Sequence, residues 1–556
     1  FNETQGIIDN SGLKRYSARL KVDHEFAKWL KAGLNLSYTY RDQDENLATI
    51  GGTNWWNAAV FLSPFLSPTS DMNDLWYSGQ KFNNPRIMLD HCLKNARRIS
   101  LNNSAFVEVT PVKGLKLRSQ FTYYSYQRHG RYYEPGYLPA KKENEGGYAS
   151  RDEYDDTSFS SENTVYYELR PKSGHNFDVL GGYTAQIKYD NNLSITGRGY
   201  TLDELTWNNM AAVPDKQNTS ISTNHTDWTK MSVFGRLNYN YKERYLLEAN
   251  LRIDGSSRFN KSNRWGYFPS FSAAWRISGE KFLRDVSWIN DLKLRAGWGQ
   301  TGNQAGLAEY GWMQQYSTNY YDWTLTENAQ AVPTVGGRSN IKNEDLTWET
   351  SSQTNVGLDF ALLNNRLSLS LDYYYKYTKD MLMSVPLPSP YPNITRNDGE
   401  MSNQGFEITL SSVNIARKDF NWSTDLNVSL NRNKVEKLNL KQVYYYATTS
   451  DATNDNVVRM TPGHPLSMFW GYVSKGVDPE TGDLVYEDRN GDGEITPLDK
   501  TWIGNANHKF TFGMTNNFSW KGLNLNILIT GSYGNDIFNA SRIETEGMAS
   551  ANNQTT

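Results

Sequence analysis

The chain has 556 residues, a formal net charge of −3 and an aromatic content of 13%, with 36 Tyr and 17 Trp. No apolar run approaches the roughly 18 residues of a membrane helix, which excludes a helical membrane protein but not a barrel, whose lumen and loops keep the average polar. Without a basic excess to meet a phosphate backbone, no nucleic-acid partner is expected. The single Cys92 can form no internal disulfide.

The first half of the chain contains paired segments in which apolar and polar residues alternate. After an opening over residues 1–13 that resembles a loop, the alternation predicts strands at about 14–25 and 30–42, 98–110 and 115–128, and 157–170 and 175–188. A period of two is produced by a strand and not by a helix. Short turns join the members of each pair, and long connections separate the pairs.

The same pattern continues through the second half, with strands at about 230–241, 245–256, 267–277 and 292–300. The hairpin over residues 354–378 is the clearest case. Thr354, Val356, Leu358 and Phe360 share one face, and the strand after the turn adds three leucines and then three tyrosines to that face. Further alternation follows at 406–410, at 421–430 and on both sides of the Lys521-Gly522 turn.

About sixteen strands are predicted, and their connections alternate between short and long. Short periplasmic turns and longer extracellular loops are typical of an outer-membrane barrel. A soluble sandwich or propeller has no reason to segregate loop length by side. The sequence therefore predicts an all-β protein, an antiparallel transmembrane β-barrel in the outer membrane of a Gram-negative bacterium, in contact with its lipid. Residues 434–504 are predicted to form one long extracellular loop.

Four segments carry a family resemblance. Residues 343–360 (NEDLTWET and QTNVGLDF), 264–270 (RWGYFPS) and 294–303 (LRAGWGQTGN), with residues 471–505, resemble motifs of the SusC/RagA-type TonB-dependent transporters. The resemblance implies a 22-stranded barrel in a Bacteroidota-like bacterium, of which residues 1–556 form one part. It also implies a plug and TonB box upstream of Phe1 and final strands beyond Thr556.

What the resemblance implies about function is import driven by TonB. A SusD-like surface lipoprotein acts as a lid in this family, and the cargo is an oligosaccharide or, in some members, an oligopeptide. Two alternatives stay open. One is a siderophore or cobalamin receptor of the same architecture, and the other is a surface barrel that displays loops for adhesion without transport.

One segment matches a calcium-binding loop of twelve residues. Asp488, Asn490 and Asp492 occupy its first, third and fifth positions, the Glu494 carbonyl the seventh and Asp499 the twelfth. Oxygen ligands on alternate residues converge on one point, as Ca²⁺ requires. Against this, the twelfth position is Asp instead of the bidentate Glu, and no flanking helices are evident. The alternative is a metal-free turn, so a structural Ca²⁺ is a prediction.

Aromatic residues gather in the long connections at Trp55, Trp56, Tyr320, Tyr321 and Trp323. Sugar rings present C–H faces that stack on aromatic planes, so these residues are candidate ligand contacts at the extracellular mouth. The alternative is anchoring at the membrane interface or packing against a partner. No HExxH, GxSxG or P-loop motif is present, and the sequence predicts no enzyme.

Overall fold

The computed structural model describes residues 1–45, 85–137, 146–200, 202–213, 218–283, 286–321, 332–389, 391–439, 456–540 and 542, with short strand segments at 49–50, 53–54, 76–77, 80–81 and 444–448. Antiparallel strands predominate within them, and 17 strands belong to one sheet. The chain divides into two compact units, one comprising Phe1–Val165, Gly182–Met231 and Ala540–Thr556, the other Tyr166–Gly181 and Ser232–Asn539. Within the described ranges, no helix has the length and apolar character needed to span a membrane.

In the first unit, successive strands pair in chain order. They are β1 (Asn2–Gln5), β2 (Gly12–Ala27), β3 (Leu30–Asp44), β8 (Leu93–Val112) and β9 (Leu115–Glu134). β10 (Gly147–Leu169), β11 (His175–Tyr200) and β12 (Thr219–Tyr241) each have one end in this unit. The connections also contain β4 (Thr49–Ile50), β5 (Thr53–Asn54), β6 (Trp76–Tyr77), β7 (Gln80–Lys81), α2 (Pro85–His91), η2 (Asp203–Asn208) and η3 (Met210–Ala212).

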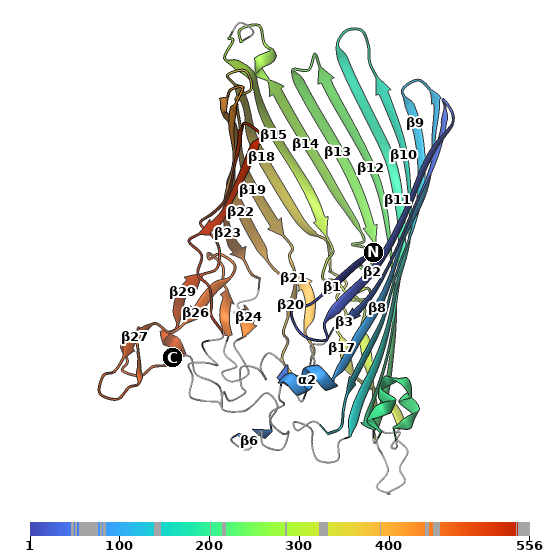
Figure 1. Ribbon diagram of the computed structural model, residues 1–556, viewed down its shortest axis with the longest axis vertical. Helices are drawn as coiled ribbons and strands as arrows, with labels where there is room; N and C mark the ends of the chain where they lie inside the picture. Colours follow the sequence, from blue (N-terminus) through green and yellow to red (C-terminus); the bar gives the residue numbers. More distant parts are fainter. Residues whose placement is uncertain are drawn as a thin grey trace. The chain divides into compact units, whose positions relative to one another are not determined.

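The second unit contains a longer ladder of the same kind (Figure 1). Its strands pair in the order β13 (Tyr245–Ser256), β14 (Trp265–Arg276), β15 (Ile289–Asn303), β18 (Glu349–Leu362), β19 (Leu367–Lys379), β22 (Glu400–Ala416), β23 (Phe420–Lys437), β30 (Phe510–Trp520) and β31 (Leu523–Tyr533). The prediction of antiparallel strand pairs in chain order is confirmed.

The long connections of the second unit form small sheets of their own. They are β16 (Gln315–Tyr321) with β17 (Val332–Asn340), β20 (Leu382–Val385) with β21 (Ile394–Asn397), and β27 (Ser474–Val477) with β28 (Leu484–Tyr486). A four-stranded sheet comprises β24 (Tyr444–Thr448), β25 (Asn456–Met460), β26 (Met468–Gly471) and β29 (Thr501–Asn505). The helical turns are η5 (Ile277–Gly279) and η6 (Pro497–Asp499).

The prediction of a loop over residues 1–13 is wrong at its start, because Asn2–Gln5 is a strand. β1 pairs with β2, placing Asn2 opposite Arg15 and Gln5 opposite Gly12. All four of its side chains are polar and exposed, so no alternation of polarity marks the segment. The segment is a strand only because its backbone forms hydrogen bonds with the edge of β2. This strand brings the number in the sheet from the sixteen predicted to 17.

Short turns of the second unit require a left-handed backbone. Leu363, Asn364 and Asn365 between β18 and β19 have φ of 56°, 58° and 60°, and Gly522 between β30 and β31 has φ of 92°. Asn and Gly adopt this region most readily, whereas Leu363 is held there by the surrounding ladder. The turn therefore closes the hairpin with the register that keeps apolar residues on one face.

Candidate functional site: the polar face and the long connections

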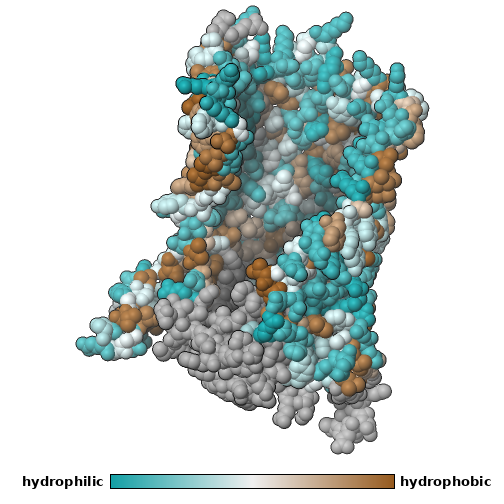
Figure 2. Space-filling view, viewed as in Figure 1, coloured by the Kyte–Doolittle hydropathy of each residue, from teal (hydrophilic) through white to brown (hydrophobic). Residues whose placement is uncertain are grey.

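The two faces of the sheet in the second unit have opposite chemistry. Cross-strand register places Val356 beside Tyr373, and Tyr373 beside Phe406, on one face, where all three side chains are exposed. Asp372 and Glu407 pair on the other face. Brown hydrophobic patches lie along the strands in Figure 2, and the strand ends are mostly teal. One face thus suits an apolar solvent and the other suits water.

The polar face contains a network of two cations and two carboxylates. Arg295 Nε donates to Asp359 Oδ2 and Arg295 Nη2 to Asp359 Oδ1, each at 2.8 Å. Arg295 Nη2 also lies 3.0 Å from Asp372 Oδ1, and Lys293 Nζ lies 2.9 Å from Asp359 Oδ2. Ser370 Oγ is within hydrogen-bond distance of both carboxylates. Charges in this arrangement balance locally while the half-buried groups stay accessible to water.

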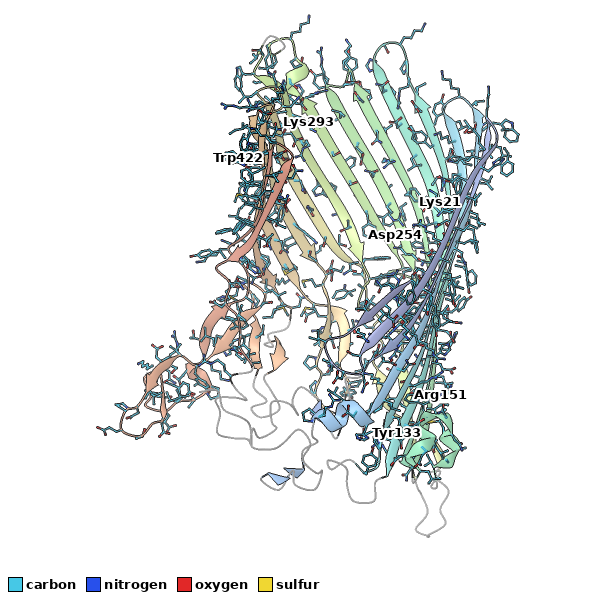
Figure 3. All side chains as sticks on the ribbon, viewed as in Figure 1. Lys21, Tyr133, Arg151, Asp254, Lys293 and Trp422 are labelled. Atoms are coloured by element: carbon cyan, nitrogen blue, oxygen red, sulfur yellow. The ribbon has the colours of Figure 1, made fainter. Side chains whose placement is uncertain are left out.

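A second ion pair lies on the same face, further along β13. Arg252 Nε donates to Asp254 Oδ1 at 2.8 Å, and Arg252 Nη2 donates to Ser232 Oγ at 2.8 Å. Figure 3 shows Lys293 nearer the short connections than Asp254. Ionic groups therefore occur at more than one level of this face, as expected for the lining of an aqueous channel.

The first unit has a comparable cluster. Lys188 Nζ lies 3.1 Å from Asp156 Oδ2 and 3.2 Å from Asp190 Oδ1, and Tyr154 Oη donates to Asp190 Oδ1 at 2.7 Å. All four groups are only half-buried. A charge-rich polar face is thus a property of each unit considered alone.

Aromatic side chains mark the level of the short turns in the second unit. Trp422 stacks on Phe518 with ring centroids 5.6 Å apart, and its Nε1 donates to Asn516 Oδ1 at 3.0 Å. Tyr245 Oη and Trp275 Nε1 donate to Glu280 Oε1 at 2.7 and 3.2 Å. These two donors lower the pKa of Glu280. Aromatic rings with hydrogen-bonded polar groups, gathered near the ends of strands, are typical of a membrane-interface belt.

The motif residues at the opposite strand ends form a packed group, the Trp348 cluster. Its members are Phe259, Phe268, Leu307, Leu346 and Trp348, all buried. The Trp348 ring lies 4.9 Å from Phe259 and 5.6 Å from Phe268, and its Nε1 donates to Arg264 O at 3.1 Å. A Cβ on Gly302 would lie 2.0 Å from the Phe268 ring, so a larger residue there would force that ring to shift. The motif residues therefore contribute to packing. Phe259 and Leu307 also belong to the cluster, although no motif or pattern in the sequence predicted it.

The candidate calcium loop is closed by its own hydrogen bonds. Asp488 Oδ1 accepts from Gly491 N and Oδ2 from Gly493 N, at 2.7 and 2.8 Å. Asp492 Oδ1 accepts from Glu494 N at 2.9 Å. A carboxylate oxygen that accepts one such bond keeps a lone pair for a cation. Asp488 and Asp492 consequently fit the role of calcium ligands, and so does the Glu494 carbonyl by its position.

Asp499 fits that role less well, because each of its oxygens already has two donors. Oδ1 accepts from Arg489 N and Asn490 N, and Oδ2 from Thr496 N and Thr496 Oγ1. The Thr496 N–H, followed by those of Arg489 and Asn490, lowers the pKa of the buried carboxyl. Within the described residues, no group of three or more His, Cys, Asp and Glu side chains is arranged to hold a metal. Calcium at this loop stays a prediction.

The sequence that forms this sheet, with one apolar and one charged face, matches a family of known proteins. A family model described as TonB dependent receptor-like, beta-barrel, matches residues 33–543. The chain belongs to this family. In such a receptor barrel the apolar face contacts lipid and the polar face lines the lumen. The predicted fold class and the predicted SusC/RagA-type relationship are confirmed.

Individual relatives support the same assignment. TonB-dependent receptor P3 of Formosa agariphila is 30% identical over 98% of this chain and 56% of its own length, and SusC of Bacteroides thetaiotaomicron is 31% identical over 70% of this chain and 40% of its own. The structure of the RagAB peptide transporter superposes with a TM-score of 0.80 and 25% identity, covering 94% of this chain and 57% of that one. The chain thus spans about half the length of these receptors.

The candidate ligand contacts of this receptor barrel are only partly described. Tyr320 and Tyr321 lie in β16, opposite Pro333 and Val332. Trp55, Trp56 and Trp323 lie outside the described residues. Ligand contact by these five aromatic residues stays a prediction.

Proposed function

We propose that the chain forms part of the barrel of an energy-dependent outer-membrane importer, and that the importer takes up oligosaccharides together with a SusD-like surface lipoprotein. One observation carries the proposal: the match to the RagAB peptide transporter over 94% of the chain, at a TM-score of 0.80. The relationship to SusC supports the same class of transporter. Because that neighbour carries peptides, oligopeptides are the alternative cargo.

The sheet has the chemistry that such a role requires. Arg295, Asp359 and Asp372 place fixed, water-accessible charges on the lumen face. A polar cargo can exchange hydrogen bonds with such a lining without losing all its hydration. A barrel of about 22 strands leaves a lumen wide enough to hold a plug, so passage would depend on energy delivered by TonB.

Uptake measurements test this proposal. Strains that lack either this gene or the TonB system are compared with the parent for uptake of labelled oligosaccharides and oligopeptides of several residues. Both deletions should abolish uptake of one class, and the intact gene supplied in trans should restore it. Normal uptake of every compound in both deletion strains, together with a loss of surface adhesion, would contradict import and favour an adhesive barrel.

A further inference from the structure

The apolar face of the second unit contains a groove that the pairing of its strands does not require. We call it the apolar groove; its volume is about 940 Å³, and side chains of β11 to β15 and of β18, which run side by side in Figure 1, line it. Its floor includes Ala273 and Ala296, a cross-strand pair that lies between Leu247 and Val356. Methyl groups at these two middle positions leave a depression between larger neighbours.

Aromatic rings form the walls of the apolar groove. Phe271 and Trp298 stack with ring centroids 6.3 Å apart, and Phe177 and Tyr239 lie with ring centroids 4.9 Å apart. Water in such a groove would find few hydrogen-bond partners, and an empty groove would forfeit dispersion contacts with its lining. Because this face contacts lipid, the group that fills the groove is an acyl chain.

The apolar groove leads to the turn between β12 and β13. His175 lines the groove and stacks on Tyr241 with ring centroids 4.4 Å apart, and its Nδ1 lies 2.9 Å from Tyr239 Oη. Lys242 Nζ lies 5.0 Å from the centroid of the Tyr241 ring. A series of contacts therefore connects the apolar lining with a cation at the level of the short turns.

The turns beside the groove carry an excess of positive charge. The Lys242 N–H donates to Gly174 O at 3.0 Å, so residues 171–174 and 242–244 lie against each other. Together they contain three cations and one carboxylate, a net charge of +2. Among the described residues, Lys172 and Lys242 form no ion pair. An anionic headgroup at this point would therefore be attracted.

We propose that the apolar groove binds one anionic diacyl phospholipid of the periplasmic leaflet. One acyl chain lies over Ala273 and Ala296, and the phosphate lies near Lys242. Lipid tails in general are as apolar as the lining, so selectivity comes from the shape of the groove and from the charge of the headgroup. A two-fold contact with a second copy would bring the two positively charged turns together, which charge repulsion opposes.

Native mass spectrometry of the full-length protein tests this site. The protein is reconstituted in equal amounts of phosphatidylglycerol and phosphatidylcholine and transferred to detergent, and the phospholipids that stay bound are counted. The unsubstituted protein should retain one phosphatidylglycerol. Ala273→Trp fills the groove, and Lys172→Glu with Lys242→Glu reverses the charge beside it. Each variant should lower the bound phosphatidylglycerol at least fivefold.

Two control variants make the same changes elsewhere on this unit. Leu369→Trp adds a ring to the apolar face of β19, where Leu369 lies between Phe360 and Leu410. Arg417→Glu with Lys418→Glu reverses two charges in the turn between β22 and β23. Both controls should retain as much phosphatidylglycerol as the unsubstituted protein.

A second measurement needs no substitution and does not depend on how the variants fold. The unsubstituted protein is irradiated in vesicles of phosphatidylglycerol with a diazirine on one acyl chain, and the labelled peptides are identified by mass spectrometry. Residues 265–276 and 289–303 should carry at least five times as much label as residues 367–379 of β19, which face the same lipid.

Three results would overturn the inference. Equal labelling of β14, β15 and β19 would show ordinary exchanging lipid, and equal retention of phosphatidylcholine would show that the positive turns select nothing. Cross-links from the groove to a second copy of the chain in place of lipid would make the groove a protein interface. None of these results changes the uptake measurements that test the proposed function.

Discussion

Arg295 on β15 and Asp359 on β18 face each other on the polar side of the sheet, joined by two hydrogen bonds of 2.8 Å. The planar guanidinium matches the carboxylate, so the two bonds fix the orientation of both side chains. Asp372 lies 3.0 Å from the same guanidinium. Arg295 therefore keeps two neighbouring carboxylates from repelling each other.

We expect Arg295→Ala to destabilise the folded barrel in detergent by about 1 kcal/mol, since water screens a half-buried pair. High salt should shrink the difference, because salt also screens the carboxylates that remain. Urea unfolding at two salt concentrations measures both effects. Lys376→Ala is the control, because Lys376 points to the same face and no ion pair is described for it. Equal losses for the two variants would show that the network contributes nothing specific.

The assignment of faces predicts opposite effects for two adjacent residues of β22. Ile408 lies between Leu371 and Val428 on the apolar face, whereas Thr409 lies between Ser370 and Asn427 on the polar face. Ile408→Arg should cost roughly 2–4 kcal/mol because it places a charge against lipid near mid-strand. Thr409→Arg should be tolerated. The fraction of folded barrel in lipid vesicles is the measurement, and similar damage from both variants would contradict the assignment.

The Trp348 cluster should be a major source of stability for the strand ends it joins. Trp348→Ala removes a buried ring from Phe259 and Phe268 and should cost about 3–5 kcal/mol. Trp288→Ala is the matched control, because Trp288 is exposed in the β14–β15 connection and should cost far less. Thermal unfolding of both variants in detergent gives the comparison. A cluster that matters only for ligand capture would leave the two melting temperatures alike.

The loop closed by Asp499 should resist acid. Hydrogen bonds from Thr496, Arg489 and Asn490 lower the folded-state pKa of Asp499 below its unfolded value of about 3.9. Their contribution to stability is fully present above the unfolded-state pKa and is lost as pH falls through the lower folded-state pKa. Amide protection factors of residues 489, 490 and 496 should therefore be constant from pH 7 to pH 5. Asp499→Asn should lower them at every pH, and protection unchanged by that substitution would contradict the closing role.

The calcium prediction has its own matched pair of substitutions. The loop should bind one Ca²⁺ per chain, and Asp488→Ala with Asp492→Ala should abolish binding because two side-chain ligands are removed. Glu494→Gln should retain binding, since position seven supplies its backbone carbonyl. Titration calorimetry of the metal-free full-length protein measures this. No heat of binding at saturating calcium would establish the loop as a metal-free turn.

Sequence alone determined most strands of the large sheet and their faces. Alternation places successive side chains on opposite faces whatever the register, so the hairpin over residues 354–378 already separated its apolar residues from Asp359 and Asp372. β1 was not predicted, because its four residues are all polar and show no alternation between apolar and polar side chains. Strands such as β11 extend beyond their predicted ends for a related reason, since alternation weakens outside the apolar band.

Only the tertiary structure decided which residues meet. Ser370 is one more polar residue in the sequence, yet register across three strands places it among Arg295, Asp359 and Asp372. Phe259 and Leu307 join Trp348 through packing between connections far apart in the chain. Cross-strand register and loop packing are set by the sum of many weak contacts, and no local pattern encodes such a sum.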